Sequence, residues 1–486
     1  MGIEKYGLVQ IDRYRWEIPK SGGMRVPARI YADPRLMKEI ADDRSPEQAR
    51  NVAHLPGIVG ASLAMPDMHW GYGFPIGGVA AFDPEKDGVI SPGGVGYDIN
   101  CGVRVVRSNL TLDDVEGKIR DLVAQLHRDV PAGVGSRGDI TADLSRARGA
   151  LVKGARWAVE NGYGWPEDPE HCEERGALAG ADPGIARRYS PRALQRGRRQ
   201  LGTLGSGNHF VEISVVEEVF NPAVAEAFGL FDGQVVLQIH SGSRGFGHQI
   251  CDDFLKVMGD AVRKYGISLP DRQLACAPVK SQEGQDYLAA MACAANYAWA
   301  NRQCLMHLSR EAIARALRTS PQALGLHLVY DVAHNIAKME RHTVGGREVT
   351  LCVHRKGATR AFPAGRPELP DDYRAVGQPV LVPGDMGRAS YVLVGQPLAL
   401  EETWGSSCHG AGRVLSRRAA VRRGRGRNIR RELADKGVVV MATERDILAE
   451  EMPEAYKDVS NVVGVMHGAG LCRKVVRLRP LGVVKG

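Results

Sequence analysis

The sequence contains none of the cysteine spacings that mark a disulfide framework or a zinc ribbon. Its nine cysteines are an odd number, and no two of them form a C-x-x-C pair. Free thiols are typical of proteins in a reducing compartment. We therefore expect a cytoplasmic protein without structural disulfides.

Long apolar segments are also missing. The first residues, MGIEKYGLVQIDRYRWEIP, have no apolar signal core. No run of about 18 apolar residues, the length that spans a bilayer, occurs in the chain. Tyr6 stands where an N-myristoylation motif beginning at Gly2 requires Ser or Thr. We expect no membrane partner.

Regular βαβα alternation is absent too, and this argues against a Rossmann fold or a TIM barrel. The hydrophobic content of 44% and charged content of 25% are ordinary for a globular protein, so disorder is not expected. No internal repeat or low-complexity linker divides the chain. We expect an α+β fold, with mixed sheets and surrounding helices in a single large domain over residues 1–486.

Periodicity locates the main elements of this fold. Strands are predicted at 78–82, 103–106, 209–216, 234–240, 326–332, 349–354, 378–384, 390–395, 437–442 and 475–484. Helices are predicted at 111–128, 246–265 and 284–319, with a charged helical stretch at 33–50. Thr111 and Asp113 are candidate caps for the first of these helices.

Positive charge is in modest excess, with 64 Lys and Arg against 56 Asp and Glu. The net charge of +8 suits a polyanionic partner such as nucleic acid. Two segments are rich in cations, 354–366 and 417–431. Each either holds an RNA backbone or forms a solvated surface, and the first, lying between strand signals, looks more like part of a site. Neither has the interleaved aromatics of an RNA-recognition motif.

Candidate metal ligands begin in SPGGVGYDINCGVR, where Asp98 and Cys101 are three residues apart. They can face one cation, or they can form a capped turn around a buried cysteine. Three histidines, His209, His240 and His334, stand at the ends of apolar runs. Any one of them alone is more often a core or loop histidine.

Taken together, these five donors indicate a metal centre. A structural zinc site needs only four ligands, so five, with a thiolate that can bridge, suggest two metals with open positions. Mixed carboxylate, imidazole and thiolate donors suit Mn, Fe, Co or Zn. Paired metals stabilise charge in phosphoryl and nucleotidyl transfer.

A further histidine, His409, lies in the glycine-rich segment WGSSCHGAGRVLSR. Arg413 follows four residues later, on the same face if a helix begins here. A neutral imidazole can attack phosphorus, and an arginine can hold the phosphate. Gly410 and Gly412 leave a phosphate room to approach the backbone. The alternative is a loop histidine at a helix N-terminus.

These motifs together closely resemble the RtcB family of RNA ligases. The resemblance extends from MPDMHWGYGFPIGG (65–78) through GYDINCGVR, GSGNHFVEI, DVAHN and SCHGAGR to LRPLGVVKG (478–486). It implies two Mn²⁺ per chain bridged by the Cys101 thiolate. His240 and His334 would complete one metal site, and Asp98 and His209 the other.

The resemblance also implies the reaction. His409 would attack the α-phosphate of GTP, release pyrophosphate and carry GMP. The guanylate would pass to an RNA 3′-phosphate, which can derive from a 2′,3′-cyclic phosphate, and a 5′-hydroxyl would then join the strands and release GMP. An archease-type activator is a plausible partner.

Further site residues come from the same resemblance. The guanine pocket would contain Glu212, Ser390, Tyr456 and Lys485, while Asn208, Asn335 and Arg413 would lie near the phosphates, with Gly410 and Gly412 beside them. RNA contacts are expected from Arg244, Arg355, Lys356 and Arg360. Glu212 can accept from guanine N1–H and N2–H₂, and Lys485 can donate to O6.

One departure concerns the loop PGDMGRASY, where the family commonly has Ser and Thr but this chain has Asp385 and Arg388. A carboxylate beside a triphosphate is repulsive unless it is paired. The two side chains, three residues apart, could compensate each other. We hypothesise altered nucleotide or RNA-end handling.

Two other functions compete with ligation. A dinuclear metal phosphoesterase acting on RNA ends would need the metal ligands but not His409 or the guanine pocket. A non-catalytic RNA-binding subunit would tolerate the loss of metal ligands, yet every expected ligand position is filled.

Overall fold

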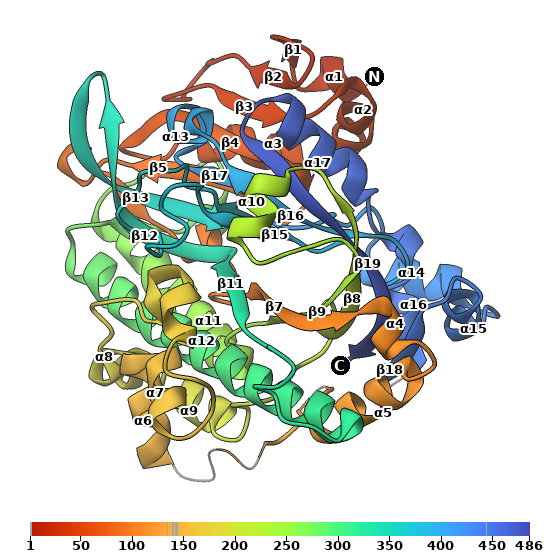
Figure 1. The fold of residues 1–486 in the computed structure, drawn as a ribbon. Helices are drawn as coiled ribbons and strands as arrows, with labels where there is room; N and C mark the ends of the chain where they lie inside the picture. The colour runs from red at the N-terminus through yellow and green to blue at the C-terminus, as the bar shows by residue number, and fades with distance from the viewer. Residues whose placement is uncertain (1, 134, 139, 141–143, 444) are drawn as a thin grey trace.

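Two large β-sheets and a set of helices make up the structure, a computed structural model (Figure 1). It describes residues 2–133, 135–138, 140, 144–443 and 445–486. The sheets and helices pack as one compact body, so the predicted α+β class is confirmed.

The eight-stranded sheet carries most of the residues predicted to form the site. Its strands, in spatial order, are β11 (Leu328–Ala333), β7 (Gly102–Thr111), β9 (Gln234–Ser241), β8 (Phe210–Val219), β19 (Cys472–Lys485), β16 (Ser390–Gly395) and β15 (Pro379–Val382), with β18 (Val439–Ala442) beside β19. Neighbouring strands are antiparallel except for β18 and β19. The long C-terminal strand β19 therefore lies inside the sheet, between β8 and β16.

The seven-stranded sheet contributes the opposite wall of the site. Its order is β1 (Val9–Gln10), β2 (Arg15–Ile18), β3 (Ala28–Tyr31), β4 (Ile58–His69), β5 (Ile76–Phe82), β13 (Arg347–Lys356) and β12 (Asn335–Val344). Two small ladders pair β6 (Val89–Ile90) with β10 (Ala277–Pro278), and β14 (Ala358–Arg360) with β17 (Ser406–Cys408). The chain crosses between the large sheets at His334, the one residue that separates β11 from β12.

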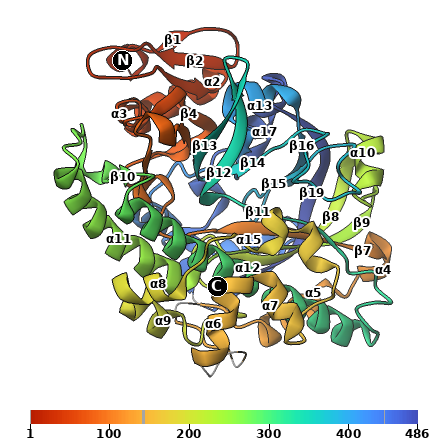
Figure 2. The ribbon, with the colours of Figure 1, turned by 90° about the vertical axis from the view of Figure 1, so that its left-hand side faces the viewer.

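Helices cover both sheets. They are α1 (Gly2–Lys5), α2 (Pro34–Asp42), α3 (Ser45–Val52), α4 (Leu112–Val115), α5 (Ile119–Asp129), α6 (Leu144–Lys153), α7 (Ala155–Glu160), α8 (Pro183–Tyr189), α9 (Pro191–Gly197), α10 (Pro222–Ala227), α11 (Arg244–Lys264), α12 (Gln282–Leu317), α13 (Pro397–Thr403), α14 (Arg417–Gly424), α15 (Ile429–Ala434), α16 (Arg445–Glu450) and α17 (Val459–Gly468). Figure 2 shows α11, α12 and α5–α9 on the side of the eight-stranded sheet away from the seven-stranded one.

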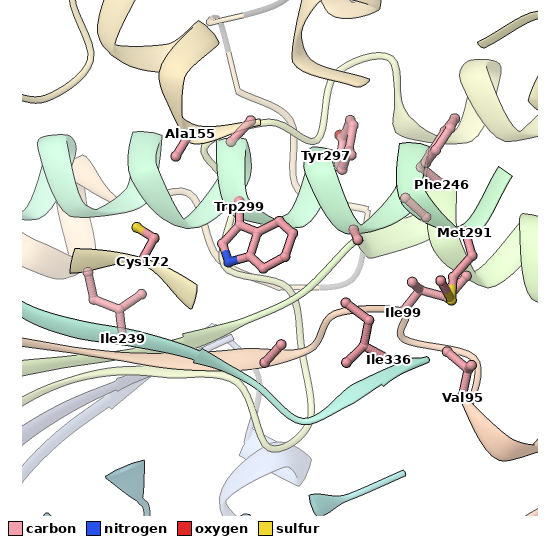
Figure 3. Close-up of a cluster of buried hydrophobic side chains, with 14 of the residues drawn as sticks. Val95, Ile99, Ala155, Cys172, Ile239, Phe246, Met291, Tyr297, Trp299 and Ile336 are labelled. Carbon is pink, nitrogen blue, oxygen red and sulfur yellow. The ribbon is translucent and has the colours of Figure 1, made fainter. Parts of the chain in front are cut away.

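The helix α12 is buried on nearly all sides, as its Ala-rich sequence permits. Trp299 and Met291 point from it toward the sheet that carries Ile239 (Figure 3). Tyr297 points to the other side, where Phe246 of α11 stacks on it at 5.3 Å between ring centroids. This core fixes the helical layer against the strands that carry the site.

The two long helices occur close to the ranges predicted for them, but the helix predicted at 111–128 is divided. Thr111 forms a capping box with Asp114 at the start of α4. Gly117 then takes φ +74°, a left-handed conformation that a continuous helix cannot contain. The chain restarts as α5. Among the described residues, no helix is both long and apolar enough to cross a membrane.

Candidate active site

Strand register brings four predicted metal ligands to one end of the eight-stranded sheet. Cys101 directly precedes β7, and His209 directly precedes β8. His240, near the end of β9, pairs with the first residue of β8. His334 directly follows β11, whose last residue pairs with the first residue of β7. Adjacent antiparallel strands therefore present these side chains side by side.

Two of these histidines contact the sulfur of Cys101, and the other candidate ligands adjoin those two histidines. Its Sγ lies 3.4 Å from His209 Nε2 and 3.2 Å from His240 Nε2. His334 Nε2 is 3.3 Å from His240 Nε2, and Asp98 Oδ2 is 3.0 Å from His209 Nε2. Ligand atoms of Cys101, His209 and His240 all lie within 4.8 Å of one another. The five residues predicted from separate motifs therefore form one cluster.

A buried arginine holds the backbone that carries Cys101. Arg302 of α12 donates to Asn100 O at 2.6 Å and to Asn100 Oδ1 at 2.9 Å. Asn100 has φ +51°, a left-handed conformation that asparagine tolerates better than most residues. Asp331 forms an ion pair with Arg302, in which Asp331 Oδ2 lies 2.7 Å from Arg302 Nε. The thiol is thus positioned by a rigid network and not by a mobile loop.

The donor set fits a cation. Burial lowers the pKa values of His240 and His334 well below the usual range, so both imidazoles are neutral with a lone pair to donate. Burial and the Asp98 carboxylate raise the pKa of the Cys101 thiol, and a bound cation reverses that shift. Asp98, despite burial, has its pKa held below the usual range by the hydrogen bond from His209. Converging lone pairs of this kind are stabilised by metal binding.

His409 is anchored by an aspartate that the sequence analysis did not select. Its Nδ1–H donates to Asp67 Oδ2 at 2.6 Å, and its backbone N–H donates to the same oxygen at 2.9 Å. This contact leaves the lone pair on Nε2 free. Burial would raise the pKa of Asp67, but the facing imidazole of His409 lowers it overall. The ring centroid of His409 is 5.0 Å from that of His334, so the histidine adjoins the candidate metal centre.

One cavity of about 440 Å³ joins these groups. It is lined by residues of both large sheets, including all five candidate metal ligands, His409, Asn208, Glu212, Asn335, Asp385, Gly410, Gly412, Arg413, Tyr456, Lys485, Arg244 and Lys356. Gly412 has φ +76°, and a Cβ there would lie 2.2 Å from Asp67 O. Glycine is therefore required where this wall meets β4.

Carboxyl groups and one amine line the far end of the cavity. Burial raises the pKa of Glu212 to about 7, although Ser214 donates to it at 2.7 Å and Lys485 lies near. Burial likewise raises the pKa of Asp385 to about 6, although the Arg388 guanidinium is 3.4 Å away. Lys485 interacts electrostatically with the carboxyl groups of Glu212 and Asp385, and its amine lies 3.9 Å from the carboxylate of Glu451. This end can offer both acceptors and a donor to a polar ring.

The tyrosine and arginine predicted for this pocket contact each other. Arg413 Nη1 donates to the Tyr456 hydroxyl at 3.0 Å and to Glu451 Oε1 at 3.1 Å. The guanidinium lies 4.9 Å from the centre of the Tyr456 ring. No helix begins at His409, so His409 and Arg413 do not share a helix face: the chain turns at Gly410–Gly412, and the next helix, α14, begins at Arg417.

Three other residues expected to contact RNA or guanine lie outside the cavity. Arg355 is fully buried and paired with Glu340 at 2.5 Å, and Arg360 is 1% exposed and paired with Glu174 at 2.7 Å. Neither side chain lines the cavity. Both stabilise the fold through buried ion pairs, so neither is available to contact RNA. Ser390 does not line the cavity either. Its Oγ accepts from Gly384 N at 3.1 Å and so supports the loop that carries Asp385.

Sequence reasoning missed Asp67, which anchors His409, and it missed His248 and Glu451, which line the cavity. Asp67 lies in the motif MPDMHW at 65–70 and His248 in SGSRGFGH, so each stood in a quoted segment that gave it no role. Glu451 had no local signal, because its partners come from distant parts of the chain.

Fold and site together define an α+β protein with a candidate metal centre beside an anchored histidine in a nucleotide-sized cavity. The chain belongs to the RtcB family, because the family model described as tRNA-splicing ligase RtcB matches residues 48–486. The resemblance inferred from the motifs is thereby confirmed.

Two relatives illustrate the closeness of the match. The chain is 56% identical over 484 residues to the tRNA-splicing ligase RtcB of Thermococcus kodakarensis, which covers 99% of this chain and 100% of that protein. It is 58% identical over 481 residues to the tRNA-splicing ligase RtcB of Archaeoglobus fulgidus, which covers 99% of each.

Proposed function

We propose that the protein is a GTP- and Mn²⁺-dependent RNA ligase that joins a 3′-phosphate or 2′,3′-cyclic phosphate end to a 5′-hydroxyl end. The observation that carries this proposal is the pairing of His409 with Asp67 beside the Cys101 cluster. A dinuclear metal phosphoesterase can use water as its nucleophile, whereas an enzyme–GMP adduct requires a side-chain nucleophile such as His409 Nε2. Family membership supports ligation of RNA.

In the first step, His409 Nε2 attacks the α-phosphorus of GTP. A P–N bond forms, the bond from the α-phosphorus to the bridging oxygen breaks, and pyrophosphate leaves. Asp67 keeps the proton on Nδ1, orients the ring and stabilises the positive charge that it gains. Arg413, which lines the same cavity, would contact the phosphates.

In the later steps, an oxygen of the RNA 3′-phosphate attacks the phosphorus of the adduct, so that the P–N bond breaks and His409 is regenerated. The 5′-hydroxyl of the second strand then attacks the activated 3′-phosphate. The phosphodiester forms, GMP leaves, and the hydroxyl proton is lost to solvent or a nearby base. A 2′,3′-cyclic phosphate must first be opened to the 3′-phosphate.

Asp98, Cys101, His209, His240 and His334 would hold the two Mn²⁺ that we propose for this site. Such cations stabilise charge on the transferring phosphate. The cysteine thiol must remain reduced to serve this site, which suits a cytoplasmic protein.

Guanine fits the polar end of the cavity. Glu212, when ionised, accepts from N1–H and N2–H₂, and Lys485 donates to O6. Adenine presents the opposite pattern at these positions, so the pocket favours GTP over ATP. The aromatic ring of Tyr456 supplies a face for the base, and Asn208 and Asn335 line the path toward the phosphates.

The test is a joining assay with an RNA pair carrying a 3′-phosphate and a 5′-hydroxyl. We expect ligated product with GTP and Mn²⁺, and none when ATP replaces GTP or when the metal is chelated. An archease-type protein, the activator we propose for this enzyme, should raise turnover. Opening or removal of the terminal phosphate without joining, in all these conditions, would instead favour the phosphoesterase function.

The Asp385→Ser substitution should strengthen GTP binding above pH 6. The pKa of Asp385 is raised to about 6, so the carboxyl is charged above that pH and neutral below it. The charged form competes with the base for Lys485. We expect the Kd for GTP to fall by about 3- to 10-fold at pH 7.5. A tenfold change in Kd has the same free energy as a shift of about one pKa unit.

Isothermal titration at two pH values checks this prediction. At pH 5 both proteins carry a neutral side chain at position 385, so their Kd values should converge. Equal Kd values at both pH values, together with unchanged RNA-end preference, would remove the basis for a special role of Asp385.

A further inference from the structure

Nearly all of the net charge of the chain lies in one short segment. Residues 416–438 hold nine of the 64 Lys and Arg and two of the 56 Asp and Glu. That leaves 55 basic and 54 acidic residues elsewhere, so the rest of the chain is almost neutral. A charge excess concentrated in this way creates a local field for a polyanion.

The segment forms α14 and α15, which project at the right of Figure 1. Six of its arginines are exposed and have no ion pair with any described residue. We call them the arginine surface: Arg418, Arg422, Arg423, Arg425, Arg430 and Arg431. A groove of about 730 Å³ runs between α14, α15 and α16, and Arg425 and Arg430 line it with one acid, Asp446.

The helices that carry these arginines are firmly packed. Ala420, Ile429 and Leu433 are buried in a core shared with β8 and β18. A Cβ on Gly424 would lie 2.8 Å from Ala449 Cβ, so glycine allows α14 and α16 to approach closely. The side chain of Asn428 caps α15 by accepting from Arg431 N at 3.2 Å. The arginines therefore project from a fixed framework.

Three neighbouring glutamates are paired with arginines outside this set. Arg427 pairs with Glu432 at 2.6 Å and with Glu454 at 2.7 Å. Arg417 pairs with Glu450 at 2.9 Å. These pairs leave the guanidinium groups of the arginine surface free to bind an external anion.

The helix α14, which carries part of the arginine surface, begins at the catalytic cavity. Arg417, the first residue of α14, lines the cavity together with His409. At about 1.5 Å rise per residue, α14 extends roughly 12 Å from that point. This distance corresponds to about two or three nucleotides, because successive phosphates of one strand are several ångströms apart.

We propose that the arginine surface binds the sugar–phosphate backbone of the RNA substrate, a few nucleotides from the end being joined. The inference rests on the proposed RNA-ligase function. Among the described residues, none of the exposed large apolar side chains lies in 416–438. A protein partner would require such anchors at the centre of its interface, so the surface favours a phosphate backbone over an acidic protein.

Two matched variants test the proposal. Arg422→Gln/Arg423→Gln removes adjacent arginines from the last turn of α14, and Arg187→Gln/Arg188→Gln removes an equivalent pair from the last turn of α8. In Figure 1, α8 lies on the opposite side of the molecule. All four side chains are exposed, so both variants should fold.

The readout is the affinity of the full-length protein for a synthetic RNA hairpin with a 3′-phosphate, measured at several salt concentrations. The α14 variant should lose about 5- to 10-fold in affinity, and its slope of log K against log salt should shrink by about 1.5. The α8 variant should match the wild type. Labelling of His409 by GTP should be equal in all three proteins.

Unchanged affinity and slope in the α14 variant, or an equal loss in the α8 variant, would overturn the proposal. If the wild type becomes labelled with GMP but the α14 variant binds RNA normally, only the proposal of the arginine surface is refuted. A wild-type protein that neither takes GMP nor joins RNA would refute the proposed function. Loss of RNA binding confined to the α14 variant would still support the surface in that case.

Discussion

The His409→Ala protein should take up no label from GTP carrying a radioactive α-phosphate, whereas the wild type should become covalently labelled in the presence of Mn²⁺. Alanine has no nitrogen to form the P–N bond, so we expect labelling to fall by at least about a thousand-fold. Denaturing gel electrophoresis measures the label, and its loss on mild acid treatment identifies a phosphoramidate.

His467→Ala is a suitable control, because His467 is exposed at the end of α17 and outside the cavity. It should label like the wild type. Asp67→Asn keeps the nucleophile but removes the carboxylate that orients it, so labelling should slow by about 100- to 10,000-fold without being abolished. Equal labelling of His409→Ala and wild type would exclude His409 as the nucleophile.

The Cys101→Ser protein should lose bound metal and labelling together. A serine hydroxyl stays protonated at neutral pH and is a poor bridging ligand for borderline cations, whereas the thiolate is a strong one. We expect two Mn²⁺ per chain in the wild type and at most one in the variant, with labelling at least about 100-fold slower. Elemental analysis after gel filtration in Mn²⁺ buffer provides the metal content.

Cys276→Ser provides the matched control for this change. Cys276 is another buried, free cysteine, and it does not line the cavity. Its replacement should leave metal content and labelling unchanged even if thermal stability falls. Full metal occupancy in Cys101→Ser would mean that the imidazoles and Asp98 suffice, and the bridging role of the thiolate would be wrong.

The cluster of candidate metal ligands could be predicted because most of its members leave a local trace in the sequence. His209, His240 and His334 each stand at a boundary between an apolar run and a polar turn. The strands that carry these residues are adjacent and antiparallel, so the end of one strand lies beside the start of the next. Their register therefore brings the histidines together. The long helices were predictable for a similar reason, since their apolar spacing is sustained over many residues.

Residues whose role depends on a distant partner could not be predicted in this way. Asp67 and His409 are separated by 342 positions in the chain. In the sequence, Arg355 and Arg360 are cations that could contact RNA. In the folded chain they are buried and form ion pairs with Glu340 and Glu174. Positive charge in a sequence does not reveal whether an acid lies opposite it, and here the second cationic segment, not the first, is the exposed one.

The position of β19 inside the eight-stranded sheet has a consequence for how the protein is made. Its neighbour β8 leaves the ribosome about 250 residues earlier, and Lys485 is the last residue of β19. A nascent chain can place the histidines near one another but lacks the strand that fills the gap between β8 and β16. The cavity that Lys485 lines is therefore complete only after β19 has been made, and products truncated before Cys472 should be unable to bind GTP.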